Sequence, residues 1–155
     1  YSSLTCPHCA AFHINTLPKI KKEYVDTDKV QIILKDFPLD LASLNAAKLV
    51  KCAKGKEKLL LLDHIYKNQA KWTKGMDIDA INENLVNIAS KFNINSNQAK
   101  KCLQDQGIEE DVLNSRINAL KKYDIDATPT VIIDEKKLDG PSSFENIEKT
   151  LKKII

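Results

Sequence analysis

The chain has 155 residues, of which 43% are hydrophobic, and this is enough apolar material for one compact domain with a real core. Its 24 basic and 21 acidic residues leave a formal net charge of +3, which is too balanced for a nucleic-acid-binding surface. No apolar run approaches the roughly 20 residues that a membrane-spanning helix requires. We therefore expect a globular domain that neither crosses a membrane nor binds nucleic acid.

The beginning of the chain has helical periodicity. Leu17, Ile20 and Tyr24 recur at the three- and four-residue spacing of one helix face, which predicts a helix from Cys6 to about Tyr24. Pro18 lies inside this helix and removes one backbone donor, so we expect a kink there rather than an end.

A short β-branched run, Val30–Leu34, predicts a buried strand, which the segment Asp36–Asp40 then ends. Residues 41–122 have the spacing of several successive helices. The β period returns at Thr130–Ile133, and Lys137–Leu138 predicts a short edge strand.

The chain closes with another predicted helix, introduced by a segment (Ser142–Glu145) that fits a capping box. Strands alternating with helices favour an α/β fold. A helix such as the one that begins at Cys6 normally follows a central strand, so we expect a first strand upstream of Tyr1, outside this sequence.

The segment Cys6-Pro7-His8-Cys9 carries the clearest chemistry. It places two sulfurs one helical turn apart, and unpaired amides at a helix start favour a negative sulfur at Cys6. His8 can add positive charge or a hydrogen bond, and Pro7 costs nothing at the first helical position. A stabilised thiolate favours the reduced form, so the disulfide is predicted to be strongly oxidising.

Two other interpretations of this segment are open. Cys6, Cys9, His8 and His13 could bind a metal ion, although a closed zinc site usually needs a second ligand pair, and the remaining cysteines lack that spacing. The bridge could also be an inert staple, although so short a loop gains little from closure.

Cys52 and Cys102 lie 50 residues apart, both in predicted helices. One close pair and one distant pair of cysteines indicate two tasks, a reactive site and a structural staple. We therefore predict a Cys52–Cys102 disulfide, with a pair of free buried thiols as the alternative, and a staple would imply an oxidising compartment.

A proline directly before a buried strand is unusual, because it cannot donate to a ladder. Thr128-Pro129-Thr130 has this arrangement. An ordinary strand-entry proline and a functional proline both fit the local sequence.

Four segments, in order and at domain spacing, carry a family resemblance. They are Ser3-Leu4-Thr5-Cys6-Pro7-His8-Cys9, Asp36-Phe37-Pro38-Leu39-Asp40, Ala127-Thr128-Pro129-Thr130 and Asp139-Gly140-Pro141-Ser142-Ser143-Phe144. On these segments the chain resembles the bacterial DsbA family, specifically the compact DsbA-like proteins of α-proteobacteria, over nearly its whole length.

The resemblance implies a thioredoxin fold, formed by residues 1–40 and 123–155, with an inserted helical domain at 41–122. It implies that Cys6 is the nucleophile, that Cys9 is its buried partner, and that Pro129 is a cis-proline facing the pair. Thr128 would then offer backbone groups to an extended substrate.

The expected function is a thiol–disulfide oxidoreductase that donates its Cys6–Cys9 disulfide to unfolded or reduced secreted proteins, without a cofactor or a metal. The implied setting is the periplasm, with a leader peptide absent from this sequence, a DsbB-type membrane reoxidant and a monomeric enzyme.

Threonine before the proline also occurs in disulfide isomerases, so an isomerase or reductase of the same fold is the alternative. From a different class, the chain could be a metal-binding or adhesion module whose cysteine pair is not redox active.

Overall fold

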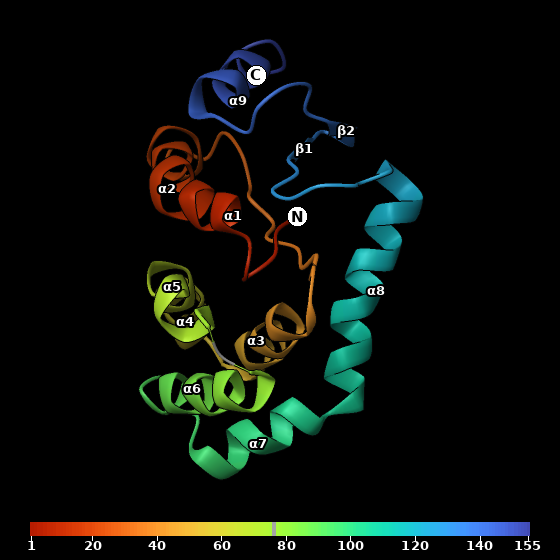
Figure 1. The fold of residues 1–155 in the computed structure, drawn as a ribbon. Coiled ribbons are helices and arrows are strands. Elements are labelled where there is room, and N and C mark those ends of the chain that lie inside the picture. The colour runs from red at the N-terminus through yellow and green to blue at the C-terminus, as the bar shows by residue number, and fades with distance from the viewer. Residues whose placement is uncertain (76) are drawn as a thin grey trace.

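The computed structural model describes residues 1–75 and 77–155, and it combines a small sheet with many helices (Figure 1). In chain order the elements are α1 (Pro7–Ala11), η1 (Phe12–Thr16), α2 (Leu17–Ile20), η2 (Lys21–Val25), α3 (Leu41–Cys52), α4 (Lys56–Lys67), α5 (Gln69–Thr73), α6 (Ile78–Ser90), α7 (Ser96–Gln104), α8 (Gln106–Tyr123), β1 (Ile132–Ile133), β2 (Lys136–Lys137) and α9 (Phe144–Leu151).

The first predicted helix is present from Pro7 to Val25 and is continuous. Two π-helical stretches, η1 and η2, alternate with the α-helical ones, and Pro18 lies in α2. Wider π turns are one way in which a helix accommodates a residue that lacks a backbone N–H donor. The helix therefore passes the proline, as expected.

The sheet is assembled around the first two residues of the chain. Ser2 bridges Asp36 in the parallel sense on one side, while Tyr1 and Thr130 exchange two backbone hydrogen bonds, of 2.9 and 3.0 Å, on the other. Farther along, β1 pairs with β2 as an antiparallel hairpin. The chain thus enters α1 from between the segments at Asp36 and at Thr130, and Cys6 follows four residues after Ser2.

The extended segment Val30–Leu34 differs from the buried strand that we expected. Val30 and Ile32 do pack against the core, but Ile33 is 64% exposed and no strand of the described chain pairs along the segment. An extended backbone forms a ladder only where a neighbouring strand lies beside it. Ser2 supplies such a neighbour at Asp36 alone.

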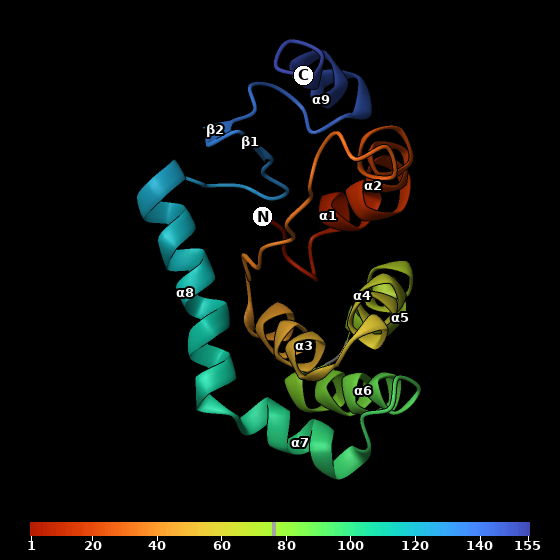
Figure 2. The same ribbon diagram turned by 180° about the vertical axis from the view of Figure 1, so that it is seen from behind.

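The helices α3 to α8 form a block below the sheet, and the long helix α8 returns the chain from the bottom of the block to β1 (Figures 1 and 2). The block surrounds one large hydrophobic cluster that includes Leu49, Leu61 and Leu85, all fully buried. The same cluster contains Cys6 and Cys9. The segment that carries the reactive cysteines therefore packs into the core of the helical block.

The closing helix α9 begins after Ser143, whose hydroxyl accepts a hydrogen bond from the Asn146 amide, so the helix is capped one residue later than the predicted box of Ser142 and Glu145. Ile147 and Leu151 of α9 are buried against Ile20 and Tyr24 of the first helix. None of the described helices is long and apolar enough to span a membrane.

Candidate active site

Cys6 is the N-cap residue of α1. Its backbone is extended, with φ −79° and ψ 119°, and Pro7 occupies the first helical turn, where its missing donor is not needed. Pro7 and His8 are exposed, whereas Cys6 is 8% and Cys9 only 1% exposed. The two sulfurs therefore differ in access, and only the edge of Cys6 lies near solvent.

The surroundings of Cys6 favour its thiolate. Burial by itself would raise the pKa of this thiol, but the Thr128 side chain, the Cys9 amide and thiol, and the His8 amide act together to bring the pKa below its ordinary value. The amides belong to the free start of α1, which carries partial positive charge. Cys6 is thus the more acidic and more reachable of the two thiols.

The surroundings of Cys9, by contrast, disfavour its thiolate. Burial raises its pKa to about 12, although the Thr128 side chain and a 3.4 Å hydrogen bond from the Ser3 amide to Sγ act the other way. The neighbouring Cys6 sulfur disfavours a second negative charge. In a reduced pair a negative charge is therefore favoured on Cys6, while Cys9 keeps its proton.

Thr128 lies against this pair, although it is 122 positions from Cys6 along the chain. The peptide bond between Thr128 and Pro129 is cis, and the Thr128 carbonyl oxygen accepts a 3.5 Å hydrogen bond from Cys6 Sγ. The Thr128 hydroxyl is buried and makes no hydrogen bond of ordinary geometry within the described chain, yet it lowers the pKa of both cysteines.

His8 reaches Cys6 through its backbone amide, and its side chain is exposed at the helix start. His13 lies elsewhere, with Nε2 3.5 Å from an Asp63 carboxylate oxygen and its ring stacked on Tyr66. Within residues 1–75 and 77–155, no three His, Cys, Asp or Glu side chains are arranged to hold a metal ion. The four candidate metal ligands therefore do not converge.

Several contacts around the site were not predicted from the sequence. Gln69 of α5 donates its side-chain amide to the carbonyl oxygens of Leu4 (2.8 Å) and Cys6 (3.1 Å). Tyr66 of α4 donates its hydroxyl to Ser2 Oγ at 2.9 Å. Both come from the helical block, more than 60 positions along the chain, and no local pattern could have indicated them.

Cys6 and Cys9 are free thiols in this structure, while Cys52 and Cys102 form a disulfide with an S–S distance of 2.05 Å. This bond joins the last residue of α3 to the last turn of α7. The predicted pairing is the one that the structure contains.

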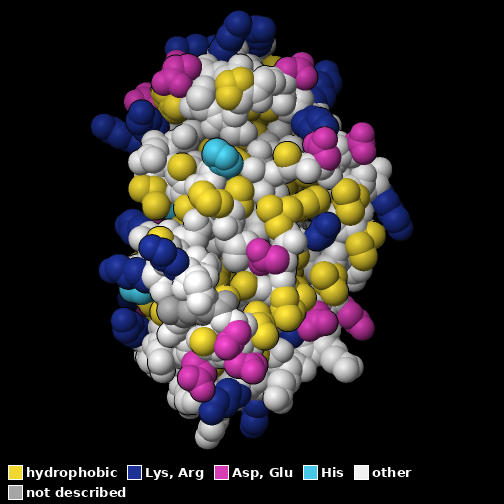
Figure 3. Space-filling view, in the orientation of Figure 1, with side chains coloured by type: hydrophobic (Ala, Val, Ile, Leu, Met, Phe, Trp, Pro, Cys, Tyr) yellow, Lys and Arg dark blue, Asp and Glu magenta, His cyan; other side chains and the backbone are white. Residues whose placement is uncertain are grey.

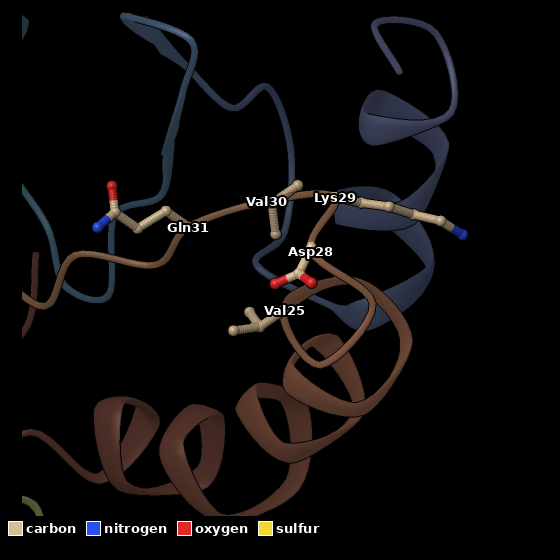
Figure 4. A pocket seen from close by; sticks show the side chains of 5 residues that line it. All are labelled: Val25, Asp28, Lys29, Val30 and Gln31. Atoms are coloured by element: carbon tan, nitrogen blue, oxygen red, sulfur yellow. The ribbon is translucent and has the colours of Figure 1, made fainter.

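A surface hollow between the end of η2 and the following extended segment is separate from this site (Figure 4). Its lining residues are Val25, Asp28, Lys29, Val30 and Gln31. They include no cysteine and no histidine, so the hollow adds nothing to the sulfur chemistry.

A family profile described as thioredoxin matches residues 1–153. The chain belongs to the thioredoxin family. Within it, the crystal structure of Wolbachia pipientis α-DsbA1 superposes with a TM-score of 0.85 at 29% identity, covering 99% of this chain and 82% of that one. A protein-disulfide isomerase of Novosphingobium aromaticivorans superposes with a TM-score of 0.87 at 18% identity, which shows the shared fold alone.

The curated relatives are also named for disulfide chemistry. A Rickettsia bellii protein named as a protein-disulfide oxidoreductase is 29% identical over the whole of this thioredoxin-family chain, and the match covers 59% of the relative's length. The chain thus spans about three-fifths of that protein. Disulfide bond formation protein D of Bacillus cereus is 28% identical, with 99% of this chain and 73% of the relative covered. These likenesses agree with the thioredoxin fold and DsbA resemblance inferred from the sequence.

Proposed function

We propose that this chain is a thiol–disulfide oxidoreductase that oxidises pairs of thiols in unfolded or reduced secreted proteins. The observation that carries the proposal is the unequal cysteine pair: Cys6 at a helix start has a lowered pKa, and Cys9 one turn inside has a raised one. Such a pair favours reduced enzyme and hence a disulfide that is readily given away.

The proposed reaction begins with the Cys6–Cys9 disulfide. A substrate thiolate attacks Cys6 Sγ, the Cys6–Cys9 bond breaks, and a mixed disulfide forms while the departing Cys9 sulfur takes up a proton. A second substrate thiolate attacks the substrate sulfur of that mixed disulfide, which forms the substrate disulfide and expels Cys6 as a thiolate. Two electrons pass from the substrate to the enzyme, and the lowered pKa of Cys6 suits its departure as a thiolate in the second step.

The surface around Cys6 supports binding of an extended, apolar substrate. The Thr128 carbonyl oxygen beside Cys6 Sγ is placed to accept a backbone hydrogen bond from a peptide, with Pro129 next to it. Leu39 and Leu41 are 47% and 55% exposed, and they flank Asp40, which accepts a hydrogen bond from Thr5 next to Cys6. Figure 3 shows hydrophobic side chains gathered across the middle of one face, with a histidine among them.

We place this chemistry in the periplasm, with a DsbB-type membrane protein to restore the Cys6–Cys9 disulfide and a monomer as the working form. The Cys52–Cys102 disulfide supports an oxidising compartment. The residues that we assign to catalysis are Cys6 and Cys9, helped by Pro7 and His8 at the helix start, with Thr128 and Pro129 binding substrate.

The test is refolding of reduced, unfolded ribonuclease by the oxidised protein. We expect the wild-type chain to form substrate disulfides faster than buffer, and we expect Cys6→Ala and Cys9→Ala, which have no Cys6–Cys9 disulfide to donate, to behave like buffer. The metal content and free-thiol count of the same samples test the alternative that the chain is a metal-binding module whose cysteine pair is not redox active. Wild-type protein that performs no better than Cys6→Ala would refute the oxidase.

Scrambled, fully oxidised ribonuclease separates the oxidase from the isomerase that Thr128 also allows. We expect slow reshuffling of the scrambled substrate by the reduced protein and fast oxidation of the reduced substrate. The reverse order would identify the isomerase instead.

A further inference from the structure

The catalytic segment is held from the helical block as well as from the sheet. Gln69 Nε2 lies 2.8 Å from the Leu4 carbonyl oxygen and 3.1 Å from that of Cys6. Both partners are carbonyl oxygens, which cannot donate, so the side chain must present its NH₂ group to them. One amide therefore holds the backbone on both sides of Thr5, directly before the reactive helix.

Gln69 is itself firmly placed. It begins α5, and Trp72 of the same short helix is 1% exposed and donates its indole N–H to the Ile65 carbonyl oxygen at 2.9 Å. The Thr73 hydroxyl donates to the Gln69 carbonyl oxygen at 2.7 Å. In Figure 1, α4 and α5 lie directly below α1. A side chain anchored in this way can fix the segment that it contacts.

We infer that Gln69 is a positioning residue for the nucleophile, and that through it the helical block helps to set how oxidising the Cys6–Cys9 disulfide is. This inference rests on the proposed function. Gln69 touches neither sulfur nor substrate. It acts by holding the Cys6 backbone so that Sγ stays in line with the amides at the start of α1.

The physical reason is a difference between the two redox forms. In the oxidised form the covalent Cys6–Cys9 bond already ties Cys6 to α1. In the reduced form that tie is gone, and the position of the thiolate depends on the backbone contacts of residues 4 to 6. The Gln69 amide also donates hydrogen bonds to two carbonyl oxygens. These bonds offset the partial negative charge of the oxygens, which would otherwise repel the nearby Cys6 thiolate. Gln69 therefore stabilises the reduced form more than the oxidised form.

The variant that tests this is Gln69→Met, which keeps the length of the side chain and removes both donors. We expect its equilibrium constant with glutathione to move by about fivefold toward oxidised protein, the size of one net hydrogen bond. The thiolate absorbance of Cys6 should titrate at a higher pH. Gln106→Met, the same change at the exposed start of α8, is the matched control and should match wild type.

Thermal unfolding of both redox forms separates positioning from plain structural support. A positioning role predicts that Gln69→Met destabilises the reduced form more than the oxidised one. Equal losses in both forms, with the wild-type glutathione equilibrium, would overturn the inference. If Gln69→Met does not fold, Gln69→Asn provides the same comparison, because its amide cannot span both carbonyls; a smaller shift in the same direction is expected, and none would overturn the inference.

The proposed function and this inference fail in different ways. Wild-type protein that does not oxidise ribonuclease refutes the function. Wild-type protein that is active, beside a Gln69→Met variant with the wild-type equilibrium constant and Cys6 titration, refutes only the role of Gln69.

Discussion

The two cysteine pairs lie at opposite ends of their helices. Cys6 caps the N-terminus of α1, where free amides favour a negative sulfur, whereas Cys52 ends α3 and Cys102 lies in the last turn of α7. Helix C-termini carry partial negative charge and disfavour a thiolate. We therefore expect the Cys6–Cys9 disulfide to be readily reduced and the Cys52–Cys102 disulfide to resist reduction.

Selective reduction gives the sharpest test of this contrast. Starting from fully oxidised protein, we expect mild dithiothreitol to free two thiols under native conditions, and reductant with denaturant to free four. The reason is that only the Cys6–Cys9 pair gains a stabilised thiolate on reduction. Thiol titration combined with peptide mapping would show which pair opened.

Release of all four thiols by mild reductant would show that the two disulfides do not differ in how easily they are reduced. The assignment of Cys6 and Cys9 would survive that result, because it rests on different residues.

Removal of the crosslink should affect stability rather than chemistry. The double variant Cys52→Ala/Cys102→Ala loses a bridge that closes a separation of 50 residues, worth up to about 4 kcal/mol in the chain-entropy model. Denaturant unfolding should show a lower midpoint, with a somewhat steeper slope because the unfolded chain without the crosslink exposes more surface. Ribonuclease oxidation at low temperature should persist; its loss would mean that the crosslink also shapes the active site.

The pH dependence of stability should distinguish the two sulfurs of the reactive pair in the reduced protein. The folded-state pKa of Cys6 is lowered, so its contribution to stability is present above the unfolded value of about 8.5 and is lost as the pH falls through the folded pKa. The pKa of Cys9 is raised to about 12, so its contribution is present below about 8.5 and is lost as the pH rises toward 12.

Reduced protein should therefore gain stability relative to oxidised protein up to about pH 8.5 and lose it above. Thermal unfolding of both forms across this range measures the effect, with Cys6→Ala as the control that removes the rising limb. A flat difference between the two redox forms would show that neither cysteine has a perturbed pKa.

Much of the site could be predicted from the sequence, because the patterns that indicate it are local. Cys6 and Cys9 are one helical turn apart in any helix that begins there, and Pro7 is favoured at the first turn of such a helix. The final helix was equally predictable, although its cap is Ser143, one residue beyond the start of the predicted capping box. The roles of the site residues and the boundaries of the inserted helical domain stay predictions.

Tertiary structure decided whatever depends on distant partners. Val30–Leu34 has the composition of a buried strand, yet Ile33 is exposed, because burial requires a neighbour that composition does not supply. The lowered pKa of Cys6 needs Thr128, which lies 122 positions away, as well as the local helix start. In the sequence, Gln69 has no feature that distinguishes it from other polar residues. It becomes part of the site only because α5 packs beneath the start of the first helix. Sequence alone therefore predicted which atoms react, and the fold decided what surrounds and holds them, because those contacts join segments that lie far apart in the sequence.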